Sequence, residues 1–93
     1  MEPIKRNMDT VSYKIRNFII EQFVFNESGF ILEETDSLVE KGIIDSVGLL
    51  ELINWLEETY RINIENEDVV PKNFDSIEKI VSFVNKKHSM ENY

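Results

Sequence analysis

The chain has 93 residues, of which 18 are acidic and 10 basic, so its formal net charge is -8. This length suits one folded domain, and the acidic balance argues against nucleic acid and anionic membrane surfaces, which attract proteins through Lys and Arg. The sequence contains no cysteine, which excludes disulfides, thiolate nucleophiles and cysteine-based zinc sites. Apolar runs are far shorter than the ~20 residues of a membrane span, and no signal peptide is recognisable. We therefore expect a cytoplasmic protein.

Apolar periodicity predicts an all-α fold, a small four-helix bundle with a long loop between the first two helices and a short third helix. The first helix is expected over residues 9–25, and Gly29 closes a stop signal after it. The connection that follows, residues 30–45, is long for a compact domain. Its apolar residues predict that it packs against the bundle; these are Ile31, Leu32, Leu38, Val39, Ile43 and Ile44.

The second helix, expected over residues 46–60, has the clearest pattern. Its predicted core stripe consists of Leu49, Leu52, Ile53, Leu56 and Tyr60. The opposite, water-facing side carries Val47, Glu51, Asn54 and Glu58. Trp55 lies at the border of the two faces, so the pattern allows both packing beneath the first helix or the loop and a role in partner contacts.

The C-terminal third is expected to hold two helices. A short segment at residues 65–70, ended by Pro71, is expected to form a brief third helix or turn. The last helix is placed at residues 75–87, with Asp75 as its N-cap and Glu78 closing a capping box. Together with the preceding elements these helices make a single domain over residues 1–93.

Two other candidate sites in this part of the chain have simpler explanations. The acidic residues 65–68 lack the spaced oxygen ligands and the glycine of an EF-hand loop, so we expect a solvated helix start and no calcium site. His88, the only histidine, lies in a polar tail without a partner at a suggestive spacing. A histidine-dependent catalytic triad is therefore not expected.

Residues 42–48 (Gly-Ile-Ile-Asp-Ser-Val-Gly) place a hydroxyl at the start of the second helix. Either Asp45 or Ser46 can cap this helix, and only one of them is needed. If Asp45 is the cap, Ser46 is free at the positive end of the helix dipole, where a phosphate ester would be stabilised. The neighbouring Val47 is either an ordinary exposed residue or an apolar anchor flanked by acids for a basic partner surface.

Asp45 and Ser46, followed by the apolar and acidic pattern of residues 47–58, resemble the phosphopantetheine attachment region of carrier proteins. This group includes acyl, D-alanyl and peptidyl carrier proteins, and the resemblance extends over residues 9–87. It implies that a phosphopantetheinyl transferase esterifies Ser46 with 4'-phosphopantetheine from coenzyme A, and that the arm's thiol carries an acyl or aminoacyl thioester. Asp45 matches the acid before the serine, which would help position the phosphate chemistry and its metal in the transferase complex.

The resemblance also implies that the chain is no enzyme, with no catalytic or metal-ligating residue of its own, and a monomer. Its partners would be a phosphopantetheinyl transferase, an adenylating acyl or aminoacyl ligase, and acyl-transferring or synthase enzymes of fatty acid or secondary-metabolite biosynthesis. Basic docking patches on these enzymes would meet Val47, Glu51, Asn54 and Glu58.

Gly48 is a departure from the fatty-acid carriers, which often have an acid at this position. The sequence around it looks more like D-alanyl carriers and stand-alone carriers that are served by a dedicated adenylating ligase. A different class of function, an unmodified helical protein-protein interaction module, would use the same exposed face without modification of Ser46.

Overall fold

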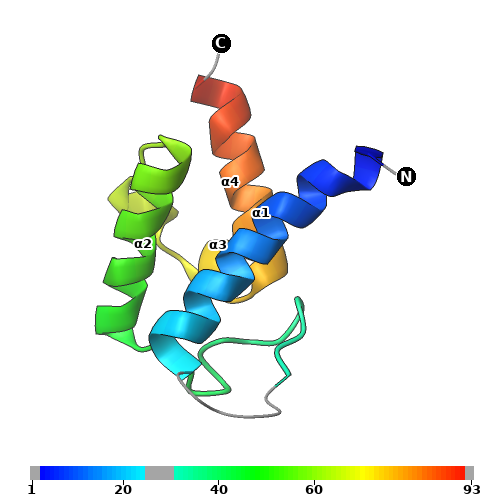
Figure 1. Ribbon diagram of the computed structural model, residues 1–93. Helices are drawn as coiled ribbons and strands as arrows, with labels where there is room; N and C mark the ends of the chain where they lie inside the picture. Colours follow the sequence, from blue (N-terminus) through cyan, green and yellow to red (C-terminus); the bar gives the residue numbers. More distant parts are fainter. Residues whose placement is uncertain (1–2, 25–30, 92–93) are drawn as a thin grey trace.

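A computed structural model describes residues 3–24 and 31–91, with side chains for residues 11–24 and 31–89. The described residues form helices and contain no strand, which confirms the predicted all-α fold (Figure 1). The elements are the helix α1 (Pro3–Ile19), the π-helix η1 (Ile20–Val24), α2 (Ser46–Tyr60), the 3-10 turn η2 (Asn66–Asp68), α3 (Pro71–Phe74) and α4 (Ile77–Glu91). None of these helices is long and apolar enough to cross a membrane, as far as the described residues go.

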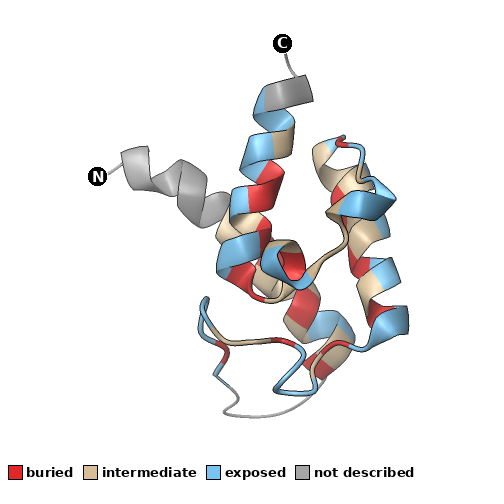
Figure 2. Cartoon of the chain, turned by 180° about the vertical axis from the view of Figure 1, so that it is seen from behind, coloured by how far each residue is buried: buried red, intermediate tan, exposed pale blue. Residues whose placement is uncertain are grey.

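The helix α4 contacts α1, α2 and the short α3, so it forms the centre of the bundle. In Figure 1, α1 runs obliquely across the molecule, α2 stands to one side, and the long loop closes the lower end. Buried residues line the inner faces of these elements (Figure 2). The core is built from Ile15, Ile19, Leu32, Leu38, Ile44, Leu52, Leu56, Ile62, Phe74, Ile77, Ile80, Phe83 and Val84.

The helix α2 has the bounds that the sequence predicts. Leu52 and Leu56 of the predicted stripe are fully buried, while Leu49, Ile53 and Tyr60 are partly buried and pack against the core. The helix ends where Arg61 adopts the left-handed conformation, with φ 57° and ψ 48°. This is a common way to terminate a helix.

The first helix is longer than predicted at its N-terminal end and changes character at its C-terminal end. It begins at Pro3. Its last turn, Ile20–Val24, is the wider π-helix η1. The predicted stop signal at Gly29 lies outside the described residues. Inserted π-helical turns are rare and redirect the side chains that follow, so η1 determines where Phe23 lies.

An aromatic series links α1 to α2. The rings of Phe18 and Trp55 are stacked with centroids 4.4 Å apart, and Tyr60 meets Trp55 edge-on at 6.0 Å. Trp55, at the border of the two helix faces, thus packs against the first helix. The hydroxyl of Tyr60 is buried without a hydrogen-bond partner among the described residues, and burial raises the pKa of Tyr60 above its usual value.

Of the two alternatives predicted for residues 65–70, the structure contains the turn, and the predicted helix at this position is wrong. Residues 65–70 contain only the 3-10 turn η2, and α3 follows it. Pro71 therefore begins this helix and does not end it. Proline fits the first helical position because its fixed φ suits a helix and its missing N–H would have no acceptor there.

The predicted start of the last helix is also wrong, and so is its capping box. The helix α4 begins at Ile77, and its cap is Ser76, whose Oγ accepts a hydrogen bond from the amide of Lys79 at 3.2 Å. The amide of Glu78 donates to the carbonyl of Glu34 in the long loop at 2.9 Å. The carboxylate of Asp75 accepts hydrogen bonds from the same loop. Asp75 and Glu78, the two residues of the predicted capping box, therefore make tertiary contacts with the loop.

The long loop packs down on the bundle, as its apolar content predicts. Leu32, Leu38 and Ile44 are buried, whereas Ile31 and Val39 are exposed. Two residues of α1 hold its first part. The Arg16 guanidinium donates to the carbonyl of Leu32, and the Ser12 hydroxyl donates to the Glu34 carboxylate at 2.6 Å.

Candidate functional site

Asp45 is the N-cap of α2, which leaves Ser46 uncommitted. The backbone of Asp45 is extended, and its Oδ1 accepts a hydrogen bond from the amide of Gly48 at 2.8 Å. Its carbonyl accepts from the amide of Leu49 at 2.9 Å. Ser46 is exposed as the first residue of the helix, and its hydroxyl has no hydrogen-bond partner in the part of the chain that the structure describes.

The surroundings of Ser46 favour an anion. Amides in the first turn of a helix have no intrahelical acceptor, and Asp45 satisfies the one on Gly48, which leaves those of Ser46 and Val47. The helix dipole adds positive partial charge at this end. The described residues contain no group of three His, Cys, Asp or Glu side chains that could hold a metal ion.

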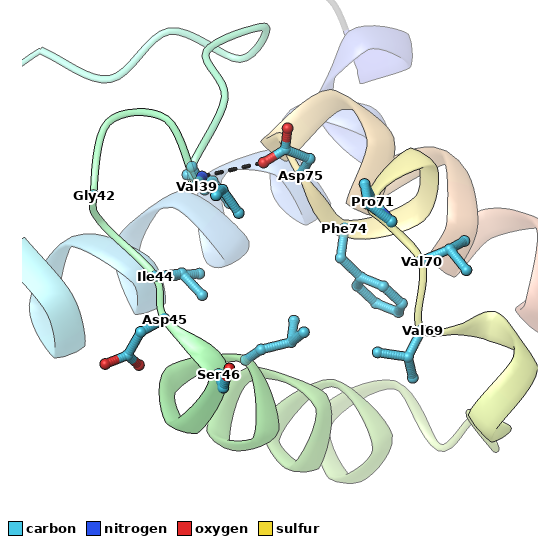
Figure 3. A pocket seen from close by; sticks show the side chains of 12 residues that line it. Val39, Gly42, Ile44, Asp45, Ser46, Val69, Val70, Pro71, Phe74 and Asp75 are labelled. Atoms are coloured by element: carbon cyan, nitrogen blue, oxygen red, sulfur yellow. Dashed lines mark hydrogen bonds between the residues drawn. The ribbon is translucent and has the colours of Figure 1, made fainter.

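A groove of about 520 Å³ opens beside Ser46 (Figure 3). The long loop forms one wall with Leu38, Val39, Gly42 and Ile44, and the other wall consists of Val69, Val70, Pro71, Phe74 and Asp75. Leu49 of α2 also lines it. The ring of Phe74 and the side chain of Val69 point into the space between the walls in Figure 3. Ser46 thus lies at the edge of a largely apolar groove, which the sequence pattern did not reveal.

The predicted partner-binding residues are exposed on one side of α2. Val47 has 66% of its surface accessible, and Glu51, Asn54 and Glu58 are exposed beside it. Leu50 is 63% exposed as well and was not identified from the sequence. Its positions relative to Ser46 (i+4) and Val47 (i+3) make it their neighbour on the helix surface, and this spacing is the signal that could have found it.

Close packing around position 48 leaves no room for a side chain there. Gly48 is buried, and a Cβ atom built on it would lie 2.9 Å from Cε1 of Phe23 and 3.3 Å from Oδ1 of Asp45. The ring of Phe23 from η1 therefore covers the first turn of α2 on the side away from solvent. An acidic side chain at position 48 would collide with it.

The chain is 27% identical over 73 residues to a probable acyl carrier protein, PigG, of Serratia sp. (strain ATCC 39006), and the match covers 78% of this chain and 83% of that protein. No protein-family model matches the chain. The match and the all-helical fold together support the acyl carrier protein family. The chain combines an exposed serine at the start of α2 with an apolar groove next to it.

Proposed function

We propose that the chain is a stand-alone carrier protein whose Ser46 bears a 4'-phosphopantetheine arm that holds an acyl or aminoacyl group as a thioester. The observation that carries the proposal is that Asp45, and not Ser46, caps the start of α2. Asp45 caps the helix, so the exposed hydroxyl of Ser46 has no structural task and is available for esterification.

The residues around Ser46 fit a phosphopantetheine group. The free amides and the helix dipole would stabilise a phosphodiester on Oγ, and the apolar groove next to it would accept the less polar parts of the arm or its cargo. The group would supply the reactive thiol that this cysteine-free chain lacks. Oδ1 of Asp45 is occupied by the cap, while the carboxylate is exposed, so Oδ2 is left to meet the metal of a transferase.

As a carrier, the chain would catalyse no step itself and would act through partner enzymes. These are a phosphopantetheinyl transferase, an adenylating ligase, and acyl-transferring or synthase enzymes with basic docking patches. The exposed apolar pair Val47 and Leu50 and the carboxylates of Glu51 and Glu58 lie on one side of α2. Complementary basic surfaces would be steered to this side.

Two kinds of cargo fit the same arm, and the groove favours one of them. Its lining is mostly aliphatic and aromatic, and burying the charged amine of an aminoacyl group against such side chains is unfavourable. An acyl cargo is therefore the first candidate. A D-alanyl or peptidyl carrier, loaded by a dedicated ligase, is the second.

The test is the intact mass of the protein before and after incubation with coenzyme A, magnesium and a broad-specificity phosphopantetheinyl transferase. The wild type and Ser82→Ala, a matched loss of an exposed hydroxyl on α4, are expected to gain one phosphopantetheinyl group. Ser46→Ala is expected to gain none. A folded wild type that gains nothing from an active transferase would contradict the carrier function and favour the unmodified interaction module.

A further inference from the structure

Asp75, between α3 and α4, ties the long loop to the rest of the bundle through three hydrogen bonds. Its Oδ2 accepts from the hydroxyl of Ser37 at 2.8 Å, and its Oδ1 accepts from the amide of Val39 at 3.1 Å. Its carbonyl accepts from the amide of Leu38 at 2.8 Å. A single residue therefore holds three consecutive loop residues.

These bonds connect the two walls of the groove beside Ser46. Leu38 and Val39 belong to the loop wall, and Asp75 belongs to the opposite wall. Figure 3 shows the bond between Val39 and Asp75 crossing from one wall to the other. Asp75 thus links the two walls at this end of the groove.

The same residue also supports the segment that leads to the serine. The carbonyl of Leu38 accepts from the amide of Ile43 at 2.9 Å and from that of Ile44 at 3.4 Å. Ile44 directly precedes Asp45, the cap of α2. A fixed Leu38 therefore fixes the chain immediately before the cap.

We propose that Asp75 is a positioning residue that sets the width of the groove and thereby the shelter given to the acyl thioester. This inference rests on the proposed carrier function. The carboxylate suits the task because its two oxygens accept two bonds at once, and bonds to a charged acceptor are stronger than those between neutral groups. Without it, the backbone bond to Leu38 would remain while the segment around Val39 could move outward.

The first measurement is amide hydrogen exchange of the unloaded protein, which requires no cargo. Loss of one hydrogen bond changes a local opening equilibrium by roughly threefold to tenfold, so Asp75→Ala is expected to speed exchange at Val39 by at least that factor. Asp75→Asn keeps Oδ1 as an acceptor and is expected to stay near the wild type at Val39. Ser37→Ala removes the bond to Oδ2 and the bond that the hydroxyl accepts from the amide of Glu40, but it leaves the bond from Val39 to Oδ1 in place. Its exchange rate at Val39 should fall between those of Asp75→Asn and Asp75→Ala. This variant takes the place of Asp75→Ala if that protein does not fold.

The second measurement is thioester hydrolysis after loading Ser46 from hexanoyl- or acetyl-coenzyme A with the broad-specificity transferase. In this reaction water adds to the acyl carbon, the C–S bond breaks and the sulfur takes up a proton. Hydrolysis of the hexanoyl group is expected to rise roughly threefold to tenfold in Asp75→Ala. The acetyl rate should not change, because so short a group makes little contact with the groove.

The control is Asn63→Ala, which removes an exposed side-chain bond to Glu65 outside the groove and should leave exchange at Val39 and both hydrolysis rates unchanged. Equal hexanoyl rates in the wild type and Asp75→Ala would overturn the inference while the loading itself still supports the carrier function. Unchanged exchange at Val39 in Asp75→Ala would overturn it too. A wild type that accepts no acyl arm would instead refute the carrier function, and the inference with it.

Discussion

The ring of Phe23 lies where a side chain on Gly48 would have to be. A Cβ atom at position 48 would stand 2.9 Å from Cε1 of Phe23, closer than carbon atoms approach without repulsion. The ring of Phe23 also makes an edge-on contact with the ring of Phe18, and the two ring centroids are 6.0 Å apart. Gly48 is thus required by close packing between η1 and α2, two residues after the serine.

Gly48→Ala is therefore expected to destabilise the fold, although alanine favours a helix. Replacing glycine by alanine in a helix normally adds about 1 kcal/mol of stability. Forcing a methyl group against a packed ring costs about 1–3 kcal/mol, so we expect a net loss of about 1 kcal/mol in the free energy of unfolding. Chemical denaturation of the two proteins measures it.

The control for this prediction is the same substitution in a background without the ring. In Phe23→Ala the space beside position 48 is open, so adding Gly48→Ala should now raise the free energy of unfolding by up to about 1 kcal/mol. The change of sign is the decisive result. If Gly48→Ala is stabilising in both backgrounds, the contact does not determine the residue at this position.

Truncation of Asp45 and of Ser46, the two residues at the start of α2, should affect the stability of the fold to different extents. Asp45 accepts the capping bond from Gly48, and loss of an N-cap typically costs about 1 kcal/mol. We expect Asp45→Ala to lose about that much stability, and Ser46→Ala to keep nearly all of it. A loss above about 1 kcal/mol in Ser46→Ala would show that the serine also contributes to the cap.

The sequence predicted α2 with its bounds, because its core stripe and its cap are both encoded locally. It also predicted that the long loop packs down, because Leu32, Leu38 and Ile44 have to leave water. The four residues predicted to face partners on α2 are all exposed, although their docking role stays a prediction. In each case the information lies in the spacing of apolar residues along the chain.

Other features depend on contacts that no local pattern contains. Asp75 and Ser76 are both good capping residues, and only the loop's use of Asp75 leaves the cap to Ser76. Pro71 can follow one helix or begin another, and the sequence does not decide between them. The groove beside Ser46 and the covering of Gly48 by Phe23 arise where distant segments meet, so only the structure reveals them.

Acid should weaken the fold through Asp68. Its carboxylate accepts from the amide of Glu65 at 2.9 Å and pairs with Lys87 at 2.9 Å. These contacts, the backbone bond first, hold the pKa of Asp68 below its usual value. Because the folded pKa is the lower one, the stabilisation is complete above the unfolded pKa of about 3.9 and disappears as the pH falls through the folded pKa.

Asp68→Asn isolates this contribution, because the amide can still accept the bond from Glu65 but carries no charge. The difference in unfolding free energy between the wild type and Asp68→Asn should be largest near neutral pH and shrink as the pH falls below the unfolded pKa of about 3.9. Since the pair is partly exposed to solvent, the difference should be small. Denaturation curves at several pH values measure it, and a difference independent of pH would refute the assignment.

Charge reversal on α2 should slow partner engagement in a salt-dependent way. Glu51 and Glu58 are exposed on the same side as Val47 and Leu50, so they would steer a basic partner toward Ser46. Glu51→Lys or Glu58→Lys is expected to lower kcat/KM with a phosphopantetheinyl transferase roughly two- to tenfold at low ionic strength. At high salt the loss should shrink, because the screening length falls from about 10 Å at 0.1 M to about 3 Å at 1 M.

The matched control for the docking side is Glu78→Lys, the same charge change at an exposed position on α4. It alters the net charge of the protein equally but lies on another helix. If the reversals on α2 act locally, they should reduce kcat/KM more than Glu78→Lys does at the same ionic strength. Equal losses from all three variants would show that only net charge matters, and losses on α2 that do not depend on salt would exclude electrostatic steering by this side.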